Sequence, residues 1–132
     1  MSTFARGVST ITLFVEDLGT CRDFYRDVLE LPLVFEDPES AVFKVGDLLV
    51  NLLDASASSE LIEPARTAEP SSGNRFVLTV PVADVDGACR DLGARGVDLL
   101  NGPLDRPWGV RTASFADPAG HIWELAQELP GA

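Results

Sequence analysis

The sequence contains one pattern twice, and a duplication of this kind limits the folds open to a chain of 132 residues. The first copy begins with the β-branched run 9–18 and the second with the run 76–85, and each run ends in Val-x-Asp followed by Leu or Val. The two aspartates, Asp17 and Asp84, are 67 residues apart. Two copies are too few for a solenoid, so the pattern predicts a pair of similar folded units.

The first copy predicts the element order β-α-β-β-β. Residues 8–15 alternate as a strand, with Ile11, Leu13 and Val15 on one face. Asp17 is a candidate N-cap for a helix over 20–29, whose apolar residues fall at helical spacing and which Pro32 prevents from continuing. Three strand-like segments then follow, at 33–36, 40–45 and 48–53.

The second copy repeats this order after a segment rich in Ser, Ala, Glu and Pro. We therefore expect a first module at 8–53, a linker at 54–74 and a second module at 75–127. The second module is expected to contain a strand, a helix that Gly96 ends, and three more strands separated by turns at Gly102-Pro103 and at Asp117 to Gly120. The four strands are expected at 76–82, 97–101, 109–116 and 122–127.

Composition excludes two classes of partner. The net charge of −11 argues against nucleic acid and anionic membranes, because phosphate groups need a basic surface. No apolar run is long enough to span a bilayer, and the start of the chain does not resemble a signal peptide, so we expect a cytoplasmic protein. Cys21 and Cys89 are expected to be small buried thiols, in preference to a disulfide or a metal-binding pair.

Two motifs link the chain to a known family. The segment from Arg106 to Leu125 contains Phe-x-Asp-Pro-x-Gly-His-x-x-Glu-Leu, and the segment from Cys21 to Leu33 is similar to the signature FYRDVLGL. With these motifs, residues 8–127 resemble the vicinal oxygen chelate superfamily, which includes glyoxalase I, extradiol dioxygenases and the bleomycin, fosfomycin and mitomycin resistance proteins. The resemblance implies an α+β fold of two βαβββ modules, each a cupped mixed sheet with its helix outside, which together enclose a cavity. It also implies a homodimer.

The resemblance further implies up to four positions for metal ligands, one in the first strand and one in the last strand of each module. In this sequence they fall on Thr10, Val77, Asn51 (or Val50) and Glu124. Divalent metals need imidazole, carboxylate or thiolate donors, usually three from the protein, and only Glu124 is of this kind. The single histidine, His121, lies three residues before Glu124 and would point to the opposite face of a strand. We therefore expect no metal ligand set and no cofactor.

The side chains at these positions suit an organic ligand better than an ion. The candidate ligand-binding residues are Thr10, Thr12, Asn51, Val77, Trp108, Arg111 and Glu124. Trp108 is expected either to stack on a planar or cationic ligand or to pack at a dimer interface. Arg111 is expected to pair with Glu124, to pair with a ligand carboxylate, or to be a surface residue. Glu124 is also the candidate catalytic residue, as a general acid or base that needs no metal.

The leading hypothesis is a metal-free protein that binds a small aromatic or cationic molecule, as in antibiotic sequestration. One alternative is a lyase, isomerase or dioxygenase that depends on Zn, Ni, Mn or Fe, with further ligands supplied by a partner chain or by the substrate. Another is a metal-free enzyme, such as an epimerase or cyclase, that uses Glu124 as its general base.

Overall fold

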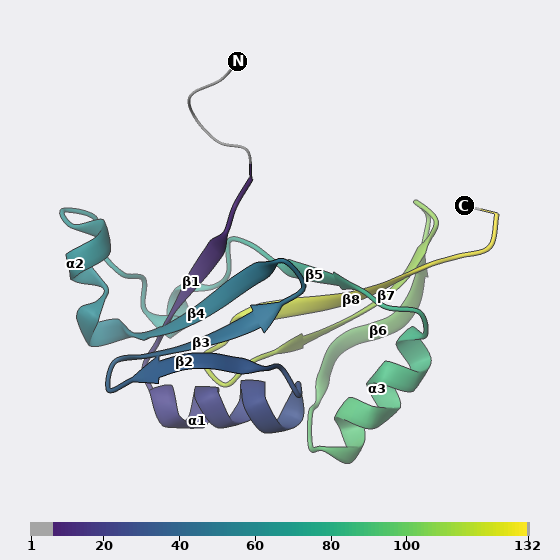
Figure 1. The fold of residues 1–132 in the computed structure, drawn as a ribbon. Helices are drawn as coiled ribbons and strands as arrows, with labels where there is room; N and C mark the ends of the chain where they lie inside the picture. Colours follow the sequence, from purple (N-terminus) through teal and green to yellow (C-terminus); the bar gives the residue numbers. More distant parts are fainter. Residues whose placement is uncertain (1–6, 132) are drawn as a thin grey trace. The chain divides into compact units, whose positions relative to one another are not determined.

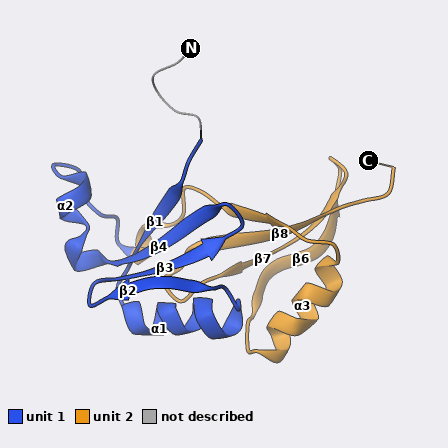
Figure 2. Ribbon diagram, in the orientation of Figure 1, with its two compact units in different colours: residues 1–69 blue, residues 70–132 orange. Residues whose placement is uncertain are grey.

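The structure, a computed structural model, describes residues 7–131 and shows two compact units (Figure 2). Unit 1 comprises residues 1–69 and unit 2 residues 70–132, so the boundary falls inside the segment that the sequence analysis assigned to a linker. The expectation that the chain lacks a signal peptide rests on residues 1–6, which lie outside the described residues.

Unit 1 contains a four-stranded mixed sheet and one main helix (Figure 1). The strand order is β1-β4-β3-β2, with β1 parallel to β4 and the other pairs antiparallel. Asp17 caps the helix, because its carboxylate accepts the backbone N–H of Thr20 at 3.1 Å. The elements are β1 (Thr10–Val15), α1 (Leu18–Asp23) with a π-helical turn (Phe24–Val28), β2 (Leu33–Asp37), β3 (Ser40–Val45) and β4 (Leu48–Asp54).

The core of unit 1 lies between α1 and one face of this sheet. The strands supply Leu13, Phe43 and Leu52, and the helix supplies Cys21 and Tyr25, all fully buried. The rings of Tyr25 and Phe43 are 5.6 Å apart, which fixes that face of β3 against the helix. The period-two alternation expected for residues 8–15 is confirmed, since Leu13 and Val15 are buried while Thr10 is exposed.

Unit 2 repeats the architecture of unit 1. Its strand order is β5-β8-β7-β6, again with the first pair parallel and the others antiparallel. The duplication and the α+β fold of two βαβββ modules are therefore confirmed. The elements are β5 (Leu78–Pro81), α3 (Val85–Ala94), β6 (Leu99–Arg106), β7 (Val110–Ala116) and β8 (Ile122–Glu128).

Two boundaries in unit 2 differ from the sequence prediction. The expected turn at Gly102-Pro103 is wrong, because β6 continues through both residues to Arg106, with a shift of register between Asn101 and Leu104. Gly102, at φ +85°, lets β6 pass close to the β7 backbone without a side chain in the way. The strand predicted over 76–82 is shorter, and Val77 lies just before β5.

The segment between the last strand of unit 1 and the first strand of unit 2 contains short helices. They are a 3₁₀ turn (Ala55–Ala57), α2 (Ser59–Ile62) and a second 3₁₀ turn (Pro70–Ser72). Ala57 and Ser58 are buried, and the hydroxyl groups of Ser58 and Thr67 are hydrogen-bonded to each other. Within residues 7–131, no helix is long and apolar enough to cross a membrane.

Candidate functional site

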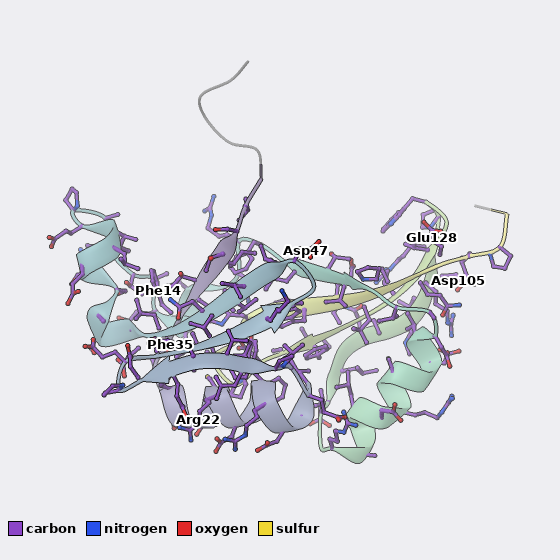
Figure 3. All side chains as sticks on the ribbon, viewed as in Figure 1. Phe14, Arg22, Phe35, Asp47, Asp105 and Glu128 are labelled. Atoms are coloured by element: carbon purple, nitrogen blue, oxygen red, sulfur yellow. The ribbon has the colours of Figure 1, made fainter. Side chains whose placement is uncertain are left out.

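The polar candidates of unit 1 share the sheet face opposite α1. Strand register places Thr12 directly opposite Asn51, and Thr10 lies two residues before Thr12 on the same face. The Asn51 side-chain nitrogen, Nδ2, donates to Thr12 Oγ1 over 3.5 Å, a long hydrogen bond. Phe14 lies on β1 two residues beyond Thr12, and the exposed Phe35 lies on the edge strand β2 (Figure 3). This face therefore combines a few hydrogen-bonding groups with apolar side chains.

Glu124 lies on the corresponding face of unit 2. Register places it directly opposite Thr79, and Thr79 Oγ1 donates to Glu124 Oε1 over 3.0 Å. On the other side of β8 its cross-strand neighbour is Ser114, which is buried. Gln127 points the other way, because its Oε1 accepts the backbone N–H of Val85 at the start of α3. Glu124, an odd number of residues away, therefore lies on the helix-free face.

The two units place equivalent pairs at the same position in their sheets. Thr12 and Asn51 face each other across the parallel β1–β4 pair, and Thr79 and Glu124 do so across β5–β8. Asn51, and not Val50, is thus the counterpart of Glu124. Thr79 lies five residues before Asp84, as Thr12 lies five before Asp17, so the equivalence of the two threonines is visible in the sequence.

Two of the remaining predicted residues are well exposed. Val77 precedes β5 and is 48% exposed. Trp108 is in the turn between β6 and β7 and is 69% exposed, so its indole is accessible to a ligand or to another protein surface. Neither residue is held by a hydrogen bond to the Thr79–Glu124 pair.

Arg111 does not pair with Glu124, which was one of the three alternatives left open by the sequence. It lies on the α3 side of β7, where Nη2 is 3.1 Å from Asp86 of α3 and Nη1 is 2.9 Å from Asp105 of β6 (Asp105 is labelled in Figure 3). Hydrogen bonds to Asp105 and Asp86 raise the pKa of the Arg111 guanidinium. Sequence spacing along β7 does not reveal these partners, because both come from other elements.

His121 belongs to the turn before β8. Its Nδ1 is 3.1 Å from Asp117 Oδ2, and the other oxygen of Asp117 accepts the backbone N–H groups of Ala119 and His121, each at 2.9 Å. The His121 ring also contacts Phe76, with centroids 6.2 Å apart. These contacts hold His121 in the turn, in keeping with its sequence position after Gly120.

Both cysteines are free thiols on helices. Cys21 of α1 is fully buried, and Cys89 of α3 is half-buried. Burial, assisted by the negative charge of Asp86, raises the pKa of the Cys89 thiol. A raised pKa lowers the thiolate fraction at neutral pH, so Cys89 has neither the charge state nor the exposure of a reactive nucleophile.

The four family ligand positions do not fit a divalent cation. Thr10 offers a neutral hydroxyl, Asn51 an amide and Val77 no donor atom, which leaves Glu124 as the one ionisable group. Among residues 7–131, no group of three or more His, Cys, Asp or Glu side chains is arranged so that it could hold a metal ion. These positions offer one hydroxyl, one amide and one carboxylate group for hydrogen bonding.

Comparisons with known proteins agree with this architecture. Residues 7–125 match the model of the Glyoxalase/Bleomycin resistance protein/Dioxygenase superfamily. The uncharacterized protein YraH of Bacillus subtilis is 33% identical over 123 residues, which cover 90% of this chain and 96% of YraH.

Two solved structures are also similar. A glyoxalase/bleomycin resistance protein/dioxygenase from Nocardioides superposes with a TM-score of 0.86 at 29% identity, covering 99% of this chain and 89% of its own. TnmS3, an antibiotic binding protein from Streptomyces sp. CB03234, superposes with a TM-score of 0.73 at 26% identity, and the match covers 96% of this chain and 99% of the TnmS3 chain.

Proposed function

This chain belongs to the glyoxalase/bleomycin resistance protein/dioxygenase superfamily, and from that premise we propose that it binds a small aromatic or cationic organic molecule without a metal ion. The observation that carries the proposal is the chemistry of the four positions at which metal-dependent relatives are expected to place their ligands. At three of them the side chain is a poor metal ligand: Thr10 and Asn51 offer only weak donor atoms, and Val77 offers none.

Glu124 is the group proposed to attract a cationic part of the ligand. The hydrogen bond from Thr79 holds one carboxylate oxygen at 3.0 Å and so fixes the direction in which the carboxylate points. The negative charge of the carboxylate remains for a partner of opposite sign. A net charge of −11 on the whole chain adds a long-range attraction for cations and a repulsion for anions.

Apolar side chains in each unit are proposed to offer surfaces for the body of a ligand. On the helix-free face of unit 1 these are Phe14, Val42 and Phe35, and in unit 2 the exposed Trp108 of the β6–β7 turn offers an aromatic surface. Aromatic rings stack on planar groups and attract cations through their π faces. Either surface therefore suits an aromatic or cationic ligand.

Sequestration of an antibiotic is the biological role that we propose for this binding. Its support is the similarity to the antibiotic binding protein TnmS3 at 26% identity over nearly the whole chain. The step from shared fold to shared role is an analogy. A cytoplasmic location and a homodimeric state belong to the same proposal, and light scattering on the purified protein measures the second of these directly.

Replacing Glu124 by Gln tests the proposal. The two tryptophans, Trp108 and Trp123, report binding when the protein is titrated with a panel of aromatic cations and their neutral counterparts in the presence of a chelator. We expect cations to bind wild type and to lose about tenfold in affinity in Glu124→Gln, whereas neutral compounds lose little, because the substitution removes charge and keeps the shape.

Asp91→Asn is the matched control, since it removes one carboxylate from the exposed side of α3 in the same unit. It should leave the affinity for cations unchanged. No binding by any compound in the panel, or equal losses in both variants, would contradict the proposal. Mass spectrometry of the recovered ligands separates binding from catalysis, because chemical change that Glu124→Gln abolishes would identify a metal-free enzyme.

A further inference from the structure

Asn51 contains a buried hydrogen-bond acceptor that the protein does not use. Its side-chain oxygen, Oδ1, is buried and, within residues 7–131, has no hydrogen-bond donor. The nitrogen of the same amide has only the long 3.5 Å bond to Thr12 Oγ1. Buried polar atoms are almost always paired in folded proteins, so an unpaired one calls for an explanation.

The neighbours of Asn51 explain why the acceptor stays unpaired. Its cross-strand neighbours are Thr12 on β1 and Val42 on β3, and its same-face neighbours along β4 are Leu49 and Leu53. Of these, only Thr12 has a polar side chain, and it is bonded to the nitrogen of the amide. The strand itself is paired on both sides, so the backbone N–H groups around Asn51 belong to the two strand ladders.

We propose that Asn51 Oδ1 accepts a hydrogen bond from the bound molecule and thereby selects ligands that present an N–H or O–H group beside an apolar body. The proposal rests on the proposed function and specifies the chemistry of its ligand. An amide oxygen is neutral, so this position selects a donor and not a charge. The apolar side chains of Val42, Leu49 and Leu53 lie around this oxygen and leave it little access to water. A ligand without a donor would leave the oxygen unpaired, so ligands with a donor should bind more tightly.

The equivalent position in unit 2 behaves differently. Glu124 lies opposite Thr79 as Asn51 lies opposite Thr12, and it accepts a hydrogen bond from Thr79 Oγ1 over 3.0 Å. Unlike Asn51, it is ionisable. A preference for cations over neutral compounds, conferred by Glu124, should therefore weaken as salt is added, because salt screens charges. A preference for hydrogen-bond donors, conferred by Asn51, should be independent of salt. Titrations at two salt concentrations therefore distinguish the two preferences.

The test uses pairs of probes in which methylation removes the donor, namely 2-naphthol with 2-methoxynaphthalene and 1-naphthylamine with N,N-dimethyl-1-naphthylamine, and compares each pair between wild type and Asn51→Leu so that the effect of the added methyl groups cancels. Binding is followed by calorimetry and by the side-chain amide signals of Asn51 in ¹⁵N NMR spectra, assigned by their absence in Asn51→Leu. We expect the donor-bearing member of each pair to bind wild type about tenfold more tightly, and this preference to disappear in Asn51→Leu. The Asn51 signals should shift with the donor-bearing probes only.

Asn101→Leu is the control, because the Asn101 oxygen already accepts from Arg106 Nη2 at 3.1 Å. It should keep the preference for donors. Asn51→Leu should also unfold at the same or a higher urea concentration than wild type, since it removes an unpaired acceptor. Binding without donor preference, or a preference that survives in Asn51→Leu, would overturn the inference and leave the proposed function standing. Failure of all four probes to bind would overturn the inference alone, because the proposed function is tested separately with the panel of aromatic cations.

Discussion

Asn51 and Glu124 are the two side chains on which the proposed ligand binding depends most. They occupy the same position in two sheets of the same design, each opposite a threonine on a parallel neighbour. One is a neutral amide with an unused oxygen and the other a carboxylate held by a hydroxyl group. A common backbone thus carries a neutral amide in one unit and a carboxylate in the other, and we propose that this difference contributes to ligand specificity.

Glu30 offers a residue-scale prediction about stability. It ends the first helix at φ +56°, the left-handed region that favours glycine, and Leu31 N–H closes the helix on the Tyr25 carbonyl at 3.0 Å. Gly96 ends α3 in unit 2 at φ +87°, where Val97 N–H closes the helix on the Leu92 carbonyl. Glu30→Gly should therefore stabilise the protein by about 0.5–1 kcal/mol, because glycine adopts this conformation without the steric cost of a Cβ.

Urea unfolding followed by circular dichroism measures this change. The reciprocal variant Gly96→Glu is the control and should destabilise by about 1 kcal/mol, although a Cβ at Gly96 would meet no atom within 4 Å. Loss of stability in Glu30→Gly would mean that the contacts of the Glu30 side chain outweigh the backbone cost.

The sequence indicates which strand positions are equivalent but does not show which side chains meet. Thr12 and Thr79 each lie five residues before a helix-capping aspartate, so their equivalence is visible in the sequence. The pairing of Thr12 with Asn51 follows only from the register of β1 on β4. Both partners of Arg111 come from other elements, α3 and β6, and were not predicted. Contacts between elements distant in sequence are not encoded in local pattern.

At the scale of elements, β6 is where the sequence signals and the fold disagree most. Gly-Pro is normally a turn signal, yet β6 passes through Gly102 and Pro103 with only a shift of register against β7. The strands over 40–45 and 48–54, by contrast, agree with the prediction to within a residue. In those strands the alternation of apolar residues and the turn residues point to the same boundaries, whereas in β6 the tertiary pairing overrides the local signal.

Gly102→Ala tests why β6 tolerates this sequence. A Cβ at Gly102 would lie 2.8 Å from Ala113 Cα and closer still to the Thr112 carbonyl oxygen, and both are backbone atoms that cannot rotate away. With the added strain of φ +85°, we expect a loss of about 2–4 kcal/mol in the free energy of unfolding. Thermal and urea unfolding measure the loss.

Gly46→Ala separates the two effects, because Gly46 in the β3–β4 turn has φ +59° but open space around its Cα. It should cost only about 1 kcal/mol. Equal losses in the two variants would show that the close approach of β6 to β7 contributes nothing.

At the scale of the whole molecule, several turn and cap carboxylates link stability to pH. Hydrogen bonds lower the pKa of three such carboxylates, Asp17, Asp37 and Asp54. The main cause in each case is a bond from a backbone N–H group, that of Thr20, Glu39 or Ser56 respectively. A bond from a side-chain hydroxyl group adds to the effect. A pKa lowered in the folded state stabilises the protein above the pKa of the unfolded chain. That contribution is lost as the pH falls through the folded pKa, so stability should decline below about pH 4.

The variant Asp17→Ala makes this prediction specific. Its urea midpoint should lie below that of wild type near neutral pH, and the two midpoints should converge as the pH falls below about 4, because protonation then removes the same interactions from wild type. Asp17→Asn, which keeps an acceptor at the cap but no charge, should show a smaller difference from wild type, and that difference should change with pH as much as for Asp17→Ala, because neither variant titrates at residue 17. A gap between wild type and Asp17→Ala that persists undiminished in acid would contradict the linkage.

The most direct test of the central claim compares ligand binding before and after metal exchange. Wild-type protein is dialysed against a chelator, or loaded in turn with Zn²⁺, Ni²⁺, Mn²⁺ and Fe²⁺, and each sample is titrated by calorimetry with the same aromatic cation after elemental analysis. We expect substoichiometric metal in every sample and the same affinity for the aromatic cation throughout. One equivalent of bound metal, with binding or turnover that disappears after chelation and returns with that ion, would contradict it.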